Sequence, residues 1–168
     1  MNRHMLIAIP MLIFMIASSC SRLNCTPEQY QYSITPNQDI TYSYDDTYNF
    51  HRYESTDGEQ LLFEFFHANQ SCEDVFDDGY AEFLRFAVDS DLVDFSFRDT
   101  SMIIIHAHYY EVGAWVTNQQ HQLTQGSISG TQLSQDQWQV DVDVSIYYDS
   151  ASGLIEKEIR FSEVFETK

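Results

Sequence analysis

Apolar and polar residues alternate with a period of two along much of the chain. From Trp138 to Tyr148 every second residue is apolar, and the residues between them are mostly polar. Successive side chains of a β-strand point to opposite faces, so this alternation predicts a strand with one buried and one solvent-facing side. Residues 61–66 are apolar at almost every position and predict a strand covered on both sides. A third alternation predicts a strand over 103–110.

Five more strands are predicted between clusters of turn-forming residues, at 39–44, 48–53, 92–98, 126–133 and 154–165. Short strands at close spacing with almost no helical pattern are typical of an antiparallel β-sandwich or a small β-barrel. We therefore predict an all-β fold. The segment 78–88 leaves one short helix open, because its apolar residues fit a helix face as well as a strand face.

The charge of the chain is strongly negative. It has 26 acidic and 8 basic residues, with a formal net charge of −18. An acidic surface repels phosphate groups, which excludes nucleic acid as a partner. High charge is also common in disordered chains, but 12 Phe and 11 Tyr supply the apolar area that such chains lack. One folded domain is expected from the length.

The N-terminus has the features of an export signal. Arg3 is followed by an apolar run over 5–17, and the small residues Ala17-Ser18-Ser19 stand directly before Cys20. A charged start, a short apolar stretch and small residues at a cleavage point predict a signal peptide over 1–19. The apolar run is too short for a transmembrane helix, which needs ~20 residues.

The segment Ala17-Ser18-Ser19-Cys20 resembles the lipobox of bacterial lipoproteins. This resemblance implies lipidation of Cys20 and a membrane anchor, although Ala17 stands where leucine is usual and an ordinary signal peptidase would also accept these residues. Ser21, rather than aspartate, follows the cysteine, as in outer-membrane lipoproteins. We expect a bacterial cell-envelope protein at the outer membrane, facing the periplasm. Its predicted parts are the signal peptide 1–19, a lipid-anchored tether 20–37 and a single β-domain 38–168.

Three cysteines leave a pair once Cys20 carries lipid. The remaining two are Cys25 and Cys72, and neither lies in a thiol motif that requires free sulfur. Exported proteins fold in an oxidising environment, where paired cysteines form disulfides. The sequence therefore predicts a disulfide between Cys25 and Cys72.

Two histidines suggest a metal site. His106 and His108 would lie on the same face of the strand predicted over 103–110, since residues two apart point the same way. Zinc and copper sites use this spacing together with further ligands. A solvent-facing stripe on the strand is the competing interpretation. No cofactor is expected apart from a divalent metal at this site, whose other candidate ligands are Asp141, Asp143, His51, His67 and His121.

Catalytic motifs are absent from the sequence. It contains no Gly-x-Ser-x-Gly elbow, no His-Glu-x-x-His helix and no phosphate-binding glycine loop, so an enzyme is not expected. Aromatic residues offer a binding role instead, because they stack on sugars and anchor protein partners. Core packing is the competing explanation for many of them. The candidates are Trp115, Tyr109, Tyr110, Tyr147 and Tyr148.

The predicted function is that of an envelope-anchored lipoprotein serving as a binding or structural module. Its partners would be the membrane, through the N-terminal lipid, and a protein or carbohydrate ligand. Two alternatives stay open: a metal-binding protein that uses His106 and His108, and an acidic inhibitor that captures a basic protein.

Overall fold

The computed structural model describes residues 25–47, 50–72, 79–114, 116, 119–150 and 153–168. Within these residues the chain forms β-strands and one short 3-10 helix, which confirms the all-β prediction. The described part contains no helix with the length and apolar character needed to cross a membrane. The elements are β1 (Cys25–Thr26), β2 (Gln29–Asp45), β3 (Phe50–Ala68), β4 (Ser71–Cys72), β5 (Tyr80–Asp89), β6 (Asp94–Arg98), η1 (Asp99–Ile105), β7 (His108–Gly113), β8 (Gln120–Gln122), β9 (Gly126–Ser134), β10 (Gln137–Ser150) and β11 (Gly153–Thr167).

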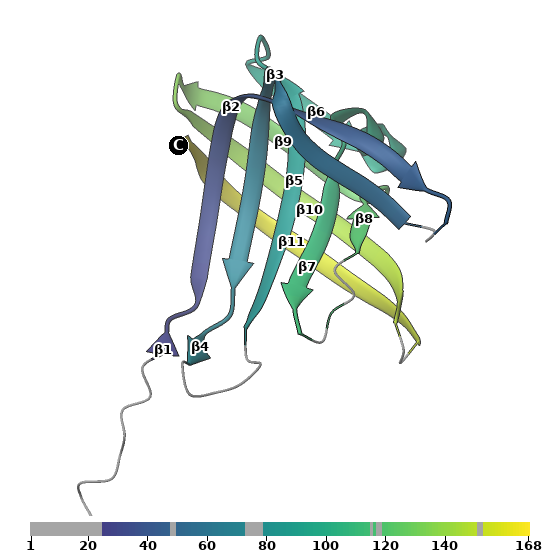
Figure 1. Ribbon diagram of the computed structural model, residues 1–168. Coiled ribbons are helices and arrows are strands. Elements are labelled where there is room, and N and C mark those ends of the chain that lie inside the picture. The colour runs from purple at the N-terminus through teal and green to yellow at the C-terminus, as the bar shows by residue number, and fades with distance from the viewer. Residues whose placement is uncertain (1–24, 48–49, 73–78, 115, 117–118, 151–152) are drawn as a thin grey trace, which may run out of the picture.

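A small antiparallel barrel and a sheet share their strands. In the described residues nine strands follow the order β5-β7-β8-β3-β2-β11-β10-β9-β6, and β3 also pairs with β5. The second pairing closes β3, β5, β7 and β8 into the barrel (Figure 1). Neighbouring strands are antiparallel except for a short parallel contact between β11 and β2. The predicted sandwich and the predicted barrel are therefore combined in one molecule.

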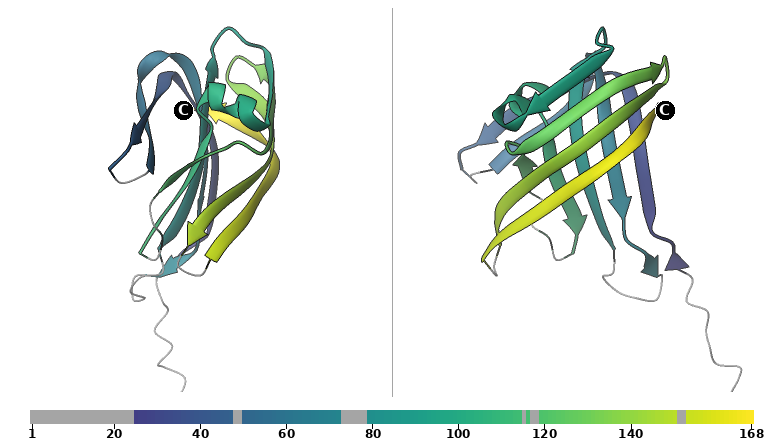
Figure 2. Two further views of the ribbon diagram at one scale, coloured as in Figure 1. Left: turned by 90° about the vertical axis from the view of Figure 1, so that its right-hand side faces the viewer. Right: turned by 180° about the vertical axis from the view of Figure 1, so that it is seen from behind.

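The main core lies between two layers of strands. β9, β10 and β11 cross diagonally over β2, β3 and β5 (Figure 2). Phe63 of β3 is stacked on Phe86, with ring centroids 4.9 Å apart, and meets the Trp138 ring edge-on at 5.6 Å. The alternation predicted for β10 is confirmed, because one of its faces is buried in this core. The buried residues of that face are Trp138, Val140, Val142, Val144 and Ile146.

The ambiguous segment 78–88 forms β5 rather than a helix. Leu84 and Phe86 point into the main core, whereas Phe83 and Arg85 are half-buried on the opposite face. β5 pairs with β3 on one side and β7 on the other, so both edges of its backbone are hydrogen-bonded. The apolar pattern of segment 78–88 fits a helix and a strand equally well, and pairing with β3 and β7 selects the strand.

The strand predicted over 103–110 is wrong in its first half. Residues 99–105 form the 3-10 helix η1, and β7 begins only at His108. Met102 and Ile105, three residues apart, are the buried side chains of η1, which matches the period of three of a 3-10 helix. The Ser101 hydroxyl supports the start of η1, since it accepts a hydrogen bond from the Arg98 amide and donates one to the Arg98 carbonyl.

A hairpin arm folds back over the barrel. We define the arm as residues 38–45 of β2 and 50–57 of β3. Its strands bend where the register shifts between Pro36 and Gln38. Asn37 has a positive φ of 59° at this point. In Figures 1 and 2 the arm stands away from the rest of β2 and β3. The base of the arm is fixed by a second, small core of Ile40, Tyr53, Leu62 and Ala87.

The disulfide predicted between Cys25 and Cys72 is confirmed. It joins β1 to β4. The Cα atoms of the two cysteines are 4.0 Å apart, within the ~7 Å that such a bond requires. β2 starts at Gln29, so residues 29–37, expected to belong to the tether, already form part of the sheet. The described sheet therefore includes residues closer to Cys20 than the sequence suggested.

Candidate functional site

Two adjoining hollows lie beside the hairpin arm. The first has a volume of about 540 Å³ and lies between β3 and β7. The second, of about 200 Å³, shares three lining residues with the first and extends to β10. We call the two hollows together the groove. It is lined by Phe50, His51, Arg52, Tyr53, Glu54, Tyr110, Val112, Gln119, Gln120, His121, Tyr147 and Tyr148.

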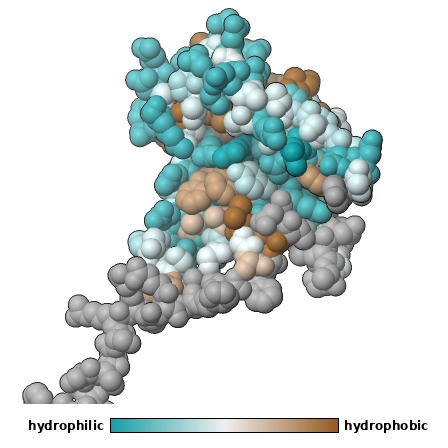
Figure 3. Space-filling model, viewed as in Figure 1, coloured by the Kyte–Doolittle hydropathy of each residue, from teal (hydrophilic) through white to brown (hydrophobic). Residues whose placement is uncertain are grey.

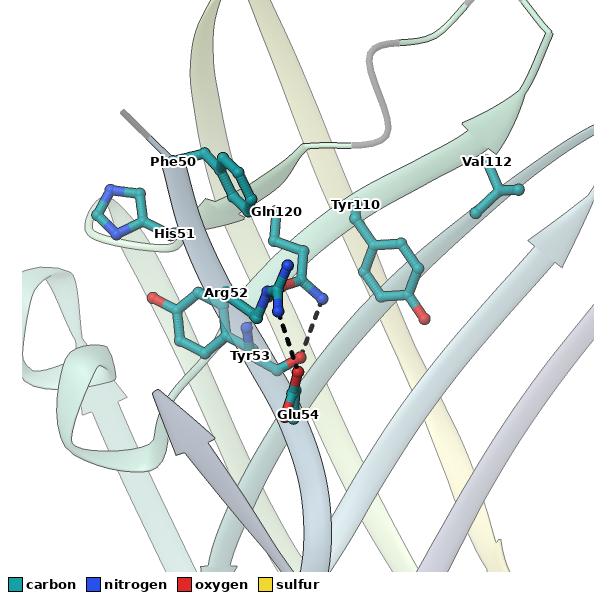
Figure 4. A pocket seen from close by; sticks show the side chains of 8 residues that line it. All are labelled: Phe50, His51, Arg52, Tyr53, Glu54, Tyr110, Val112 and Gln120. Carbon is teal, nitrogen blue, oxygen red and sulfur yellow. Dashed lines mark hydrogen bonds and ion pairs between the residues drawn. The ribbon is translucent and has the colours of Figure 1, made fainter. Parts of the chain in front are cut away.

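Strand alternation decides which side chains of the arm face the first hollow. Figure 4 shows the rings of His51 and Tyr53 pointing away from Tyr110 and Val112. Tyr53 is buried, and its ring stacks on His108 with centroids 4.3 Å apart. Phe50, Arg52 and Glu54 belong to the opposite face of the strand. These three side chains, together with Tyr110, Val112 and Gln120, supply the chemistry of the first hollow.

Gln120 holds the arm against β8 in the centre of the groove. The Tyr53 amide donates a hydrogen bond to Gln120 Oε1 at 2.5 Å, and Gln120 Nε2 donates to the Tyr53 carbonyl at 3.1 Å. The side-chain amide thus pairs with Tyr53 as a neighbouring strand would. This bidentate pairing fixes the position of the groove floor without help from a ligand.

Tyr110 ends an aromatic row that crosses three strands. Phe66, Phe83 and Tyr110 are register partners on β3, β5 and β7, and Gln120 is next in the same row. The Phe83 and Tyr110 rings are stacked at 4.6 Å, and the Arg85 guanidinium lies 5.4 Å from each ring centroid. In Figure 3 tan to brown surface lies over the lower ends of these strands. The row therefore holds the Tyr110 ring rigidly at the edge of the first hollow.

The charged side chains of the groove form a solvent-accessible pair. Arg52 Nη1 lies 3.7 Å from Glu54 Oε1, and both side chains are more than half exposed. This separation is longer than a hydrogen bond, so each group keeps most of its hydrogen-bonding capacity for other partners. The pair offers donors and acceptors side by side.

The second hollow is lined by side chains that contact one another or a neighbouring strand, among them His121, Tyr147 and Tyr148. His121 stacks on Tyr148 with centroids 4.6 Å apart, and burial lowers the pKa of His121, which favours the neutral imidazole. Tyr147 is exposed and donates a 2.5 Å hydrogen bond to Glu156. This end of the groove thus presents the stacked rings of His121 and Tyr148 and one exposed tyrosine.

A network of buried charges lies behind Tyr148. Lys157 Nζ donates to Glu82 and, at 3.1 Å, to Glu111, and it also contacts the hydroxyls of Tyr109 at 2.6 Å and Tyr80 at 2.9 Å. Burial disfavours the charge on Lys157, but the bonds to Glu82 and Tyr80 outweigh burial and raise its pKa. With this many partners, the three ammonium protons are all engaged. The arrangement is a closed structural network rather than a site awaiting a ligand.

His67 connects this network to the start of the domain. Its Nδ1 lies 2.7 Å from Glu82 and its Nε2 lies 2.8 Å from Glu28, while the Tyr30 ring stacks on it at 4.3 Å. Burial would lower the pKa of His67, but the hydrogen bonds to Glu82 and Glu28 outweigh that effect and raise it. The charged imidazole therefore ties Glu28, close behind β1, to the body of the protein.

The aromatic candidates from the sequence have different positions. Tyr110, Tyr147 and Tyr148 all line the groove. Tyr109 is fully buried, and its hydroxyl lies 2.8 Å from Glu82 and 2.5 Å from Glu111, either of which can accept its proton, so it is a core residue and not a binding residue. Trp115 lies outside the described residues, as does the lipidation candidate Cys20.

The metal hypothesis loses its geometric basis. His106 is the left-handed C-cap of η1, so it does not share a strand face with His108. His108 is 2% exposed and neutral, because burial lowers its pKa to about 4, and its ring packs inside the barrel on Tyr53. Asp141 and Asp143 point to solvent on β10. Nowhere in the described residues do three metal-ligating side chains come together.

The other groove side chains were missed by sequence reasoning. Phe50, Arg52 and Glu54 lie at alternate positions of one arm strand, and Gln120 belongs to a three-residue strand. The alternation of Phe50, Arg52 and Glu54 was visible in the sequence, but nothing in it indicated that the arm bends back toward β7.

Comparisons with protein-family models, with curated proteins and with solved structures find no match for this chain. The geometry of the groove and the N-terminal sequence are therefore the basis for a functional conclusion.

Proposed function

We propose that this protein is a lipid-anchored carbohydrate-binding module of the bacterial cell envelope, facing the periplasm. The observation that carries the proposal is the groove, in which the rigid Tyr110 ring stands near Phe50 and beside the exposed pair of Arg52 and Glu54 (Figure 4). A sugar ring has an apolar C–H face and a rim of hydroxyl groups. Aromatic rings pack on such a face, and charged groups make strong hydrogen bonds to such hydroxyls.

The rigidity of the groove supports a binding role. Tyr110 is held by Phe83 and Arg85, and Gln120 is held by the Tyr53 backbone. A site whose groups are already in place loses little conformational entropy when the ligand arrives. The first hollow is also open to solvent rather than enclosed, which suits one segment of a larger, chain-like ligand.

The N-terminal sequence supports the location. The lipobox-like segment ends at Cys20, and β1 begins only five residues later at Cys25. In Figure 1 β1 and β4 lie at one end of the molecule, and the arm with β8 lies toward the other side. An anchor at Cys20 would hold the domain close to the membrane and leave the groove facing outward.

The binding half of the proposal is tested with a glycan panel and isothermal titration calorimetry. Tyr110→Ala and Arg52→Ala should each weaken glycan binding by about tenfold or more, equivalent to ~1.4 kcal/mol. Tyr30→Ala is the matched control, because Tyr30 is an exposed tyrosine that stacks on His67 and does not line the groove. Circular dichroism checks that each variant is folded. The proposal fails if the wild-type protein binds no glycan, or if the control loses as much affinity as Tyr110→Ala.

The anchoring half is tested with Cys20→Ser. The variant should accumulate as a soluble periplasmic form or as uncleaved precursor. Partition of the variant into detergent with the wild-type mature mass would contradict a lipid at Cys20.

A further inference from the structure

The groove has a different charge from the rest of the protein. The whole chain carries a formal charge of −18. Among the residues that line the groove, Arg52 and Glu54 supply one positive and one negative charge. His121 is neutral because burial lowers its pKa. With histidines counted as neutral, as in the formal charge of the chain, the charges of the lining balance within a strongly acidic molecule.

The surroundings of the groove disfavour an anionic ligand. Glu156 holds the Tyr147 hydroxyl at the rim of the second hollow. Beyond such contacts, the summed field of an acidic protein repels anions over distances of about a Debye length, ~8 Å at physiological ionic strength. An acidic polysaccharide would approach against this field at every point along its chain.

A cationic ligand is disfavoured at the centre of the groove. The Arg52 guanidinium lines the first hollow and lies between Phe50 and Glu54, 5.8 Å from the Phe50 ring centroid and 3.7 Å from Glu54 Oε1 (Figure 4). A ligand cation bound to Glu54 would have to lie against Arg52 or displace it. An uncharged hydroxyl avoids both costs, because it accepts from the guanidinium and donates to the carboxylate.

Building on the proposed function, we infer that the ligand is an uncharged glycan whose neighbouring hydroxyl groups are recognised by Arg52 and Glu54 acting as one donor–acceptor pair. The Tyr110 ring packs on the sugar face, and the charged pair sets the specificity. The acidic body of the protein excludes glycans that carry carboxylate groups.

The test compares an uncharged glycan from the panel with its carboxylated counterpart on the same backbone. Titration calorimetry is performed at about 0.05 M and about 0.5 M salt. The uncharged glycan should bind with nearly equal affinity at both concentrations. The carboxylated glycan should bind about tenfold more weakly at low salt, and the difference should narrow at high salt because screening weakens the repulsion.

Two variants with the same change in charge distinguish the effect of the charged pair in the groove from the effect of the acidic surface elsewhere. Glu54→Gln and Asp143→Asn each remove one negative charge, and Asp143 lies on β10 away from the residues that line the groove. Glu54→Gln should weaken binding of the uncharged glycan several-fold and reduce the discrimination against the carboxylated one. Asp143→Asn should leave the affinity for the uncharged glycan unchanged and should alter that for the carboxylated glycan much less than Glu54→Gln does, because it removes one of many charges of the body.

The outcomes distinguish this inference from the proposed function. Equal or tighter binding of the carboxylated glycan overturns the inference, while glycan binding at the groove still stands. An equal response of Glu54→Gln and Asp143→Asn also overturns it, because the charged pair would then have no specific role. If neither glycan binds the wild-type protein, the proposed function and the inference both fail.

Discussion

At the residue scale, the protein places its charged groups in two very different environments. Arg160 and Asp143 form an exposed pair at 3.0 Å, with side chains more than half accessible to solvent. Lys157, Glu82 and Glu111 lie between strands, and their side chains are between 12% and 26% exposed. The same kind of ion pair therefore has different consequences for stability in the two places.

Lys157→Met should lower the free energy of unfolding by about 2–3 kcal/mol, because it removes the cation that the largely buried carboxylates of Glu82 and Glu111 share. Arg160→Met is the matched control and should cost less than about 1 kcal/mol, since its partner returns to water. Urea denaturation of both variants measures the difference. Equal losses for the two variants would show that the buried network has no special role.

His67 should make stability depend on pH. Its pKa is raised in the folded state, so the charged imidazole stabilises the fold fully below its unfolded pKa of about 6.5, and this stabilisation is lost as pH rises through the folded-state pKa. The wild-type free energy of unfolding should therefore decline from about pH 6.5 upward, more steeply than that of His67→Gln.

The titration of His108 does not interfere with this measurement. Burial lowers its pKa to about 4, so it changes stability only below its unfolded pKa of about 6.5, where falling pH favours the unfolded chain. The difference between wild type and His67→Gln above that pH isolates His67. Parallel pH profiles for the two proteins would contradict the assignment, and an NMR titration of the imidazole gives an independent check.

At the scale of elements, the bend at the base of the hairpin arm determines whether a groove exists. Pro36 pairs with Leu61, but Gln38 pairs with Asp57, so the two strands are out of step at this point. Asp39 stabilises the bend, because its Oδ1 accepts hydrogen bonds from the amides of Glu59 at 3.0 Å and Gln60 at 3.1 Å. Without the bend, the arm would continue away from β7.

Gly58→Ala should disturb this bend. A Cβ atom at residue 58 would lie 2.0 Å from the Asp39 carboxyl carbon, which forces that side chain away from the two amides it binds. We expect a loss of about 1–3 kcal/mol in unfolding free energy and faster hydrogen exchange in the arm. Gly79→Ala is the control, because nothing lies within 4 Å of the added atom, and it should change stability by less than about 0.5 kcal/mol. Unchanged hydrogen exchange in the arm of Gly58→Ala would contradict the role of the bend.

At the scale of the whole molecule, the start of the domain is fixed at two points. The disulfide joins Cys25 to Cys72, and Glu28 is bound to His67 of β3. The disulfide holds β1 against β4 in a separate two-stranded sheet, and the Glu28–His67 contact joins the segment after β1 to β3 of the nine-stranded sheet. The start of the described chain is therefore linked to β4 through the disulfide and to β3 through His67.

Removal of the disulfide should have a large effect. Cys25 and Cys72 are 47 residues apart, and the chain-entropy model gives about 4 kcal/mol as an upper figure for closing a loop of this length. The Cys25→Ser, Cys72→Ser double variant should lose up to that amount in urea denaturation, measured in a Cys20→Ser background without a third thiol. Two alkylated thiols in the non-reduced protein that retains Cys25 and Cys72 would show that the bond does not form in solution.

The sequence by itself determined the features that depend on the pattern within a single strand or on the number of cysteines. The alternation from Trp138 to Ile146 specified a buried face, because the period of two is a property of a single extended strand. The disulfide followed from three cysteines and a likeness to lipoproteins.

Tertiary structure alone decided which residues meet. Phe50 is far from Tyr110 and Gln120 in the sequence, and it meets them because the arm bends and the barrel closes. The barrel buries His108 against Tyr53, and the main core buries Tyr109 on the other face of β7, although the local pattern offered both as surface residues. A periodic pattern says which face of a strand is apolar, but strand register and curvature depend on hydrogen bonds between distant segments, and these determine where that face points.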